Sequence, residues 1–180
     1  MSGLQTMLVL AVIVTLAAAI WDQQTGLIPN TITYPLLALG AVTHLAITLA
    51  RFPNASSLII ILEIIAGATL CALVPFLLWR KSAMGGGDVK LLAGLGALLG
   101  PSVGLELELY AFLCGVVMAP IVLAYRGQLG ATAKRSFALL IRPFSKTKQE
   151  PNADKKPLTE LRFGPAICLA TLLVAFLEWK

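Results

Sequence analysis

Two aspartates stand in settings that could support acid–base chemistry, Asp22 and Asp88. Asp88 follows three consecutive glycines, which are Gly85, Gly86 and Gly87. Such a run allows backbone angles closed to other residues and lets the backbone pass close to another chain segment. Because Asp88 also opens an apolar run, its carboxylate lies at the edge of a bilayer, where an ionisable group is by default a functional hypothesis. The alternative is a short polar loop in which Asp88 is only the N-cap of the next helix.

Asp22 stands at the end of the first apolar run, in the sequence Trp21-Asp22-Gln23-Gln24-Thr25-Gly26. The following residues, Ile28-Pro29-Asn30-Thr31, have the pattern of a helix start. They predict extended backbone at Pro29 and an N-cap at Asn30.

Two aspartates that face each other near a membrane surface can perform aspartic-protease chemistry. Close carboxylates cannot both ionise, so the pair shares one proton. One carboxylate then acts as the base on a water molecule, while the other polarises the scissile carbonyl as an acid. This chemistry requires neither a metal nor a nucleophilic side chain. Lys90 lies two residues after Asp88 and does not share its helical face, so we expect it to extend toward the membrane surface or to tune the electrostatics of the site.

The composition is that of a membrane protein. Of the 180 residues, 58% are hydrophobic and 13% are charged, whereas soluble domains have about 45–50% apolar and about 25% charged residues. The sequence therefore predicts an all-α, polytopic bundle that forms one integral-membrane domain over residues 1–180. Cys71, Cys114 and Cys168 lie in apolar runs without metal-ligand spacing, and we expect them to act as small hydrophobic residues rather than as disulfides or zinc ligands. His44 is predicted to be a polar core residue, and we expect no metal site.

Six apolar stretches are long enough, or nearly so, to cross a bilayer, which takes about 20 residues. They are approximately Leu4–Trp21, Thr31–Ala50, Leu58–Trp79, Val89–Val103, Leu105–Tyr125 and Gly164–Trp179. The first lacks a basic start and a convincing cleavage site, so we interpret it as a retained helix rather than a signal peptide. The fourth is short and rich in glycine, which predicts close helix packing.

The distribution of basic residues predicts the orientation. With six spans, twelve of the 14 Lys and Arg residues fall on the side that holds the turn 22–30, the loop 80–88 and the segment 126–163. That side is therefore predicted to be cytoplasmic, with both termini outside. Residues 129–142 suit a helix on an anionic membrane surface, or a solvated basic loop. The net charge of +5 is explained by lipid and orientation, and we expect no nucleic-acid partner.

Several of these motifs resemble those of a known family. Asp22 with Ile28-Pro29-Asn30, the run from Gly85 to Leu92, and Phe163-Gly164-Pro165 are together similar to the type IV prepilin peptidases, the GxGD class of membrane aspartic proteases. In this resemblance Gly85 and Gly87 fill the glycine positions of the motif. It covers essentially the whole chain.

The resemblance implies an aspartic endopeptidase with Asp22 and Asp88 as its catalytic residues. The implied residues that shape the loop or the substrate site are Gly85, Gly86, Gly87, Lys90, Pro29 and Asn30. It further implies prepilin or pseudopilin precursors as substrates, whose short basic leaders are removed at the cytoplasmic face of a bacterial inner membrane, and no cofactor. Because Asp22 directly follows the first span, we expect no methyltransferase region. The chain thus resembles the short peptidases of tight-adherence (Flp-type) pilus systems.

Two other functions are compatible with some of these residues. Asp22, Asp88 and Glu63 could form the proton relay of a transporter or channel, because intramembrane carboxylates mark such pathways. A relay would spread its carboxylates through the membrane, however, whereas Asp22 and Asp88 are predicted at one face. The chain could also be a non-catalytic subunit of a secretion system, although the presence of both aspartates argues against this.

Overall fold

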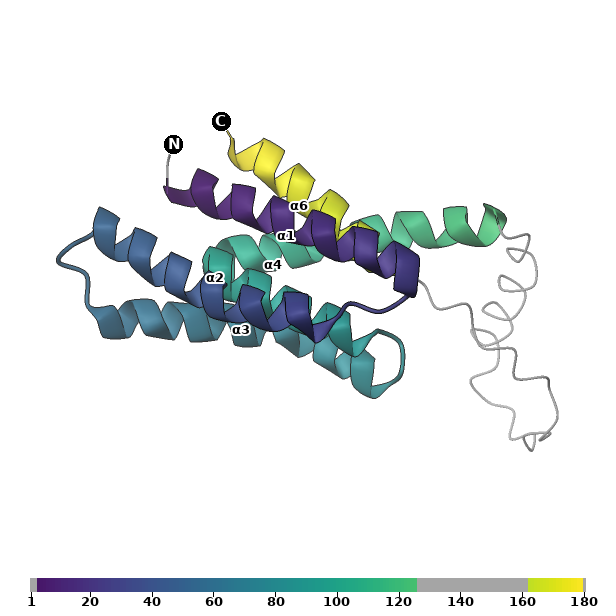
Figure 1. The fold of residues 1–180 in the computed structure, drawn as a ribbon, viewed down its shortest axis with the longest axis horizontal. Helices are drawn as coiled ribbons and strands as arrows, with labels where there is room; N and C mark the ends of the chain where they lie inside the picture. Colours follow the sequence, from purple (N-terminus) through teal and green to yellow (C-terminus); the bar gives the residue numbers. More distant parts are fainter. Residues whose placement is uncertain (1–2, 126–161, 180) are drawn as a thin grey trace, which may run out of the picture. The chain divides into compact units, whose positions relative to one another are not determined.

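The structure is a computed structural model that describes residues 3–125 and 162–179. The helices in these ranges are α1 (Gly3–Thr25), α2 (Asn30–Arg51), α3 (Ser57–Arg80), α4 (Gly86–Tyr125) and α6 (Gly164–Glu178) (Figure 1). The first four are long and apolar enough to cross a membrane, and α6 is a shorter apolar helix. The chain is an all-α multi-pass membrane protein, which confirms the predicted fold class. The described residues contain four to five apolar membrane-spanning helices, whereas the sequence predicts about six.

The chain divides into two compact units. One consists of Met1–Gly115 with Arg162–Lys180, and the other of Val116–Leu161. The first unit contains α1, α2, α3, α6 and α4 as far as Gly115. The predicted basic segment at 126–163 lies outside the described residues except for its last two, and so does the helix suggested at 129–142. The prediction of one domain over 1–180 stays a prediction.

The first part of α4 forms the centre of the first unit. Between residues 91 and 100 every side chain or glycine except Ala93 is buried. Gly96 packs so tightly against Gly67 of α3 that neither position has room for a Cβ. Small residues let helix backbones approach closely in lipid, so the prediction of a closely packed glycine-rich helix is confirmed. The other helices instead expose large apolar side chains, such as Ile13, Leu62 and Phe176, which suits a surface in contact with lipid.

A break at Gly100 divides α4. Gly100 has φ 78° and ψ 175°, a backbone conformation that strongly favours glycine. Beyond it the chain folds back, because a Cβ on Gly104 would lie only 3.1 Å from the Cα of Gly96. In a straight helix these two residues would be about 12 Å apart. The fourth and fifth predicted spans are thus joined in one broken element, and the break lies at Gly100 rather than at the predicted 103–105.

His44 satisfies a backbone group that this break exposes. The helix interruption, followed by Pro101 without an N–H, leaves carbonyls at the end of the first segment without helical partners. The Leu98 carbonyl accepts a hydrogen bond from His44 Nδ1 at 2.9 Å. Because His44 is buried, the prediction of a polar core residue is confirmed. The three cysteines are free, and Cys71 and Cys168 are buried.

One end of the first unit collects the segments that the sequence analysis singled out. The helices α1 and α6 lie side by side and antiparallel (Figure 1), so the end of α1 meets the start of α6. The α1–α2 connection and the start of α4 also meet there, through Ile28 and Gly87. Asp22, Asp88 and Phe163-Gly164 therefore belong to the same end of the unit.

Candidate active site

Asp22 lies in the last turn of α1, where the helix ends by a local mechanism. The Gly26 N–H donates to the Asp22 carbonyl at 2.8 Å, and Gly26 has φ 72°. This is the left-handed helix end for which glycine is preferred. The Thr25 hydroxyl donates to the Trp21 carbonyl at 2.9 Å and accepts from the Leu27 N–H at 3.3 Å. The chain therefore turns sharply after α1, and Asp22 is held at a defined place on the last turn.

The Asp22 side chain points into the unit and is held by the start of α6. It is 4% exposed, and its Oδ2 accepts a hydrogen bond from the Gly164 N–H at 3.0 Å. A helix N-terminus stabilises a carboxylate through its free N–H groups. Arg162 adds an attractive charge and donates a hydrogen bond to the Gln23 carbonyl. The Phe163-Gly164 segment thus binds a carboxylate that precedes it by 142 residues.

Asp88 is the third residue of α4, so it is not the N-cap considered as an alternative. Its carboxylate accepts a hydrogen bond from the backbone N–H of Gly85, just before the helix. This return bond resembles half of a capping box, and an acidic residue in the first turn suits the helix dipole. The side chain is 8% exposed, so a second carboxylate is held in a largely buried position.

The glycine run before Asp88 is required for close packing rather than for unusual torsion angles. Among the described residues, positive φ at glycine occurs only at Gly26 and Gly100, so residues 85–87 do not use the angles that are closed to other residues. The close approach that glycine allows is present at Gly87. A Cβ there would lie 2.9 Å from the Ile28 Cβ and 3.0 Å from the Ile28 carbonyl oxygen.

The two aspartates act on each other electrostatically, since Asp22 lies near enough for its charge to repel that of Asp88. Both are largely removed from water, which strengthens the interaction. A pair of like charges in such surroundings lowers its energy by retaining one proton. Such a pair favours one carboxylate and one carboxylic acid at the same end of the unit, a combination that can serve acid–base chemistry.

The start of α2 differs in detail from the prediction. Pro29 is extended, with φ −72° and ψ 148°, as expected, but α2 begins at Asn30 without a side-chain cap hydrogen bond. The predicted N-cap at Asn30 is therefore wrong. Its Oδ1 instead accepts a hydrogen bond from Lys90 Nζ at 2.7 Å, and the Tyr34 hydroxyl lies 3.3 Å from the same nitrogen. Because the Asn30 side chain makes no cap hydrogen bond, its oxygen is available for the contact with Lys90.

Three further residues at this end have no predicted role in the site. The sequence indicates Arg162 only as a basic residue and Ile28 only as part of a helix start, and it gives no signal for Tyr34. Each contributes through a contact between distant segments, and such contacts have no local sequence signal. Arg162 could have been noticed because it directly precedes Phe163-Gly164.

The structure also bears on the carboxylates proposed for a proton relay. Glu63 is exposed on α3, whereas Glu108, which was not considered, is 4% exposed with its Oε1 lacking a hydrogen-bond partner. Within residues 3–125 and 162–179, no three His, Cys, Asp or Glu side chains gather in a way that could hold a metal ion.

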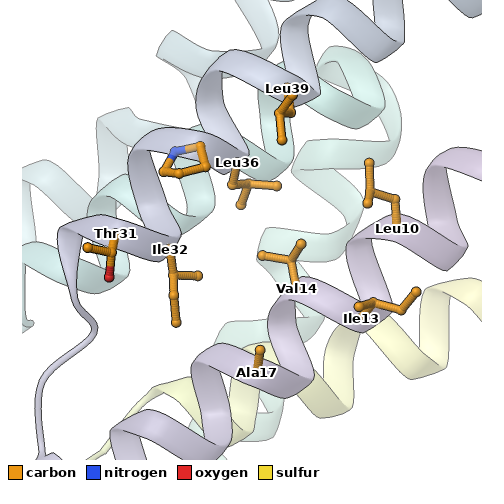
Figure 2. Close-up of a pocket in the computed structure, with 9 residues that line it drawn as sticks. Leu10, Ile13, Val14, Ala17, Thr31, Ile32, Leu36 and Leu39 are labelled. Carbon is orange, nitrogen blue, oxygen red and sulfur yellow. The ribbon is translucent and has the colours of Figure 1, made fainter.

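A cleft of about 230 Å³ lies between α1 and α2. Figure 2 shows side chains from the two helices lining it from both sides. The lining residues are Leu10, Ile13, Val14, Ala17, Thr31, Ile32, Pro35, Leu36 and Leu39. None of these side chains titrates, so the cleft has no acid–base chemistry of its own, and the candidate active site is the aspartate pair.

Comparison with known proteins gives an independent view of these residues. The type IV leader peptidase family matches residues 9–120, which include both aspartates. A "prepilin leader peptidase/N-methyltransferase" of Burkholderia pseudomallei strain 1026b is 36% identical over 117 residues, covering 63% of this chain and 36% of that protein. A protein of the same name from Neisseria gonorrhoeae is 34% identical over 111 residues, covering 59% and 37%.

A shorter relative is "Leader peptidase HopD" of Salmonella typhimurium strain LT2, which is 38% identical over 86 residues, covering 46% of this chain and 52% of that protein. The chain therefore spans about a third to a half of the length of the curated relatives it matches. No solved structure matches.

Proposed function

Because the chain belongs to the type IV leader peptidase family, we propose that it is an aspartic endopeptidase with Asp22 and Asp88 as its catalytic residues. Its substrates are prepilin or pseudopilin precursors, from which it removes short basic leaders. The observation that carries the proposal is the pair of buried, mutually repelling carboxylates at one end of the helix unit. Gly85, Gly86 and Gly87 shape the start of α4 beside this pair, and Pro29 and Asn30 shape the start of α2.

The surroundings of the two carboxylates suggest which one acts as the base and which one as the acid. Asp22 is the better site for the negative charge, because the Gly164 N–H and Arg162 both stabilise it. Asp88 then retains the shared proton. In the first step Asp22 removes a proton from water, the water oxygen attacks the scissile carbonyl carbon, and Asp88 gives its proton to the carbonyl oxygen. In the second step the C–N bond breaks and the proton held by Asp22 passes to the leaving amine. One hydroxyl of the tetrahedral intermediate returns its proton to Asp88 as the new carboxyl group forms, which restores the starting pair.

The location of the site follows from the membrane orientation predicted by the basic residues. Both aspartates face the cytoplasmic side of a bacterial inner membrane, where a leader peptide would reach them. The substrate's apolar helix lies in the lipid beside the bundle.

We also propose that this chain cleaves without methylating the new N-terminus. The relative named "Leader peptidase HopD" is 38% identical and its name carries cleavage alone, whereas the name of the Burkholderia protein carries two activities. Cleavage alone would agree with the short Flp-type peptidases that the sequence resembles. Mass spectrometry of the mature product tests this, and an added methyl group that depends on this chain alone would contradict it.

Cleavage by variants tests the catalytic assignment. We predict that Asp22→Asn and Asp88→Asn each reduce cleavage of a co-expressed precursor about 100-fold or more, because neither carboxyl can act as both acid and base. The size shift of the precursor is the measurement, with membrane insertion verified for each variant.

The matched control is Glu63→Gln on α3, which we expect to cleave like the wild type. A proton relay through Glu63 predicts the opposite pattern, in which this variant is impaired as well. Near-normal cleavage by either aspartate variant would contradict the proposal.

A further inference from the structure

The Lys90 side chain joins the starts of two helices that are distant in the sequence. Its Nζ donates to Asn30 Oδ1 at 2.7 Å and to the Tyr34 hydroxyl at 3.3 Å. The same nitrogen lies 4.9 Å from the centre of the Tyr34 ring, within the range of a cation–π interaction. Asn30 and Tyr34 are in the first turns of α2, and Lys90 is in the first turns of α4. One ammonium group therefore holds two helix starts together.

The stability of α4 alone does not explain this lysine. A cation near the N-terminus of a helix opposes the helix dipole, which favours negative charge there. Lys90 is the fifth residue of α4 and occupies such an unfavourable place. Its hydrogen bonds across to α2 are charge-assisted and stronger than neutral ones. Lys90 therefore stabilises the contact between α2 and α4 rather than α4 itself.

The contact lies next to the candidate catalytic residues without including them. Lys90 follows Asp88 by two residues and so points to a different side of the helix. Asn30 begins α2 directly after the connection that leads from Asp22 through Ile28. A second contact, Gly87 on Ile28, joins the same two segments. The Lys90 contact and the Gly87 contact thus hold the start of α4 against the chain that follows Asp22.

We propose that Lys90 is a positioning residue, which uses Asn30 and Tyr34 to fix the start of α4 and thereby the place of Asp88 relative to Asp22. This inference rests on the proposed peptidase function. Lys90 acts through the backbone of α4 and touches neither the water nor the scissile bond. Its loss therefore lowers the catalytic rate and leaves substrate affinity nearly unchanged.

The test compares kcat and KM for a precursor cleaved by purified variants. Lys90→Met keeps the length of the side chain but removes the ammonium group, and we expect kcat to fall about 10- to 100-fold at a KM within about two-fold of the wild type, since small displacements of catalytic groups cost rates of this order. Lys90→Arg keeps the charge and the donors and restores part of kcat. Lys81→Met, an exposed lysine just after α3, is the matched control and should leave both constants unchanged.

A second comparison tests whether Asn30 is the partner through which Lys90 acts. Asn30→Leu should lower kcat like Lys90→Met, and the double variant should lose little more than either single variant, because both remove the same contact. Tyr34→Phe keeps the ring and removes only the longer hydrogen bond, so its kcat should fall less than that of Asn30→Leu. A wild-type kcat for Lys90→Met, a loss confined to KM, or single losses that multiply in the double variant would each overturn the proposal.

A failure of the proposed peptidase function can be distinguished from a failure of the Lys90 proposal. If the wild type cleaves no precursor, the peptidase assignment is wrong, and thermal unfolding in detergent still tests the contact. Equal shifts in Tm for Lys90→Met, Asn30→Leu and the double variant would support the joining of α2 and α4. Additive shifts would contradict it.

Discussion

At the scale of single residues, the site depends on how Asp22 is held. The carboxylate is bound by a backbone N–H at the start of α6, and glycine at that position leaves room for it. A Cβ on Gly164 would lie 2.8 Å from Asp22 Oδ2 and 2.9 Å from the Asp22 Cβ. These distances are too short for a carbon atom, so a larger residue at 164 must displace Asp22.

We therefore predict that Gly164→Ala lowers kcat about 10- to 100-fold, because it moves a catalytic carboxylate away from its position. The measurement is precursor cleavage by purified protein whose folding has been verified. Leu169→Ala, which shortens an exposed side chain on the same helix, should cleave normally. Equal rates for Gly164→Ala and the wild type would show that the position of Asp22 is not critical.

Both aspartates could be predicted from the sequence, but the groups that hold them could not. Asp22 and Asp88 could be predicted because Asp22 ends one apolar run and Asp88 begins another, and the count of basic residues places both on one side. The hydrogen bond from Gly164 to Asp22 joins residues 142 positions apart. Such a pairing depends on the packing of α1 against α6, and no local pattern reveals it.

At the scale of the helices, the break in α4 determines how the central helix packs. The sequence Gly100-Pro101 contained the signal for its position, because the residue before proline is biased away from the helical conformation. Hydrophobicity alone nevertheless predicts a fourth span that continues to Val103. Apolar residues on both sides of the break conceal it, since hydropathy does not respond to backbone torsion angles. The predicted cap at Asn30 failed for a related reason, because a tertiary contact with Lys90 replaces the local one.

We predict that Gly100→Ala destabilises the protein by about 1–3 kcal/mol, because alanine is strained at φ 78° and ψ 175°. The added Cβ would also lie 3.1 Å from His44 Cε1. The free energy of unfolding in a mild detergent is the measurement. Ser82→Gly is the opposite control, because Ser82 has φ 54° and glycine there should stabilise by about 1 kcal/mol. A neutral Gly100→Ala would contradict the described break.

At the scale of the whole molecule, the orientation in the membrane decides which compartment supplies the substrate. The all-α membrane class could be predicted from composition, because a chain that is 58% hydrophobic and 13% charged has too few polar residues for a soluble domain. The number of spans was harder to predict, because α4 joins two predicted spans in one broken element. The orientation itself stays a prediction from the basic residues.

Labelling of single cysteines checks this orientation. In a background without the three native cysteines, we predict that Asn54→Cys, in the exposed α2–α3 connection, reacts with a membrane-impermeant maleimide added to intact cells. Gln24→Cys, exposed in the last turn of α1 near Asp22, should react only after the membrane is permeabilised. The reverse pattern would place the candidate active site outside the cell and contradict the proposed cytoplasmic cleavage.

The most direct test of the aspartate pair is cleavage of a purified precursor by the purified protein in detergent with EDTA present. Acid–base catalysis by two carboxyls provides both the activated water and the polarised carbonyl. We predict that the wild type cleaves fully in EDTA, that Asp22→Asn and Asp88→Asn do not cleave, and that mass spectrometry shows hydrolysis at one peptide bond. Cleavage that is lost in EDTA and restored by zinc, or that persists in either aspartate variant, would contradict the account.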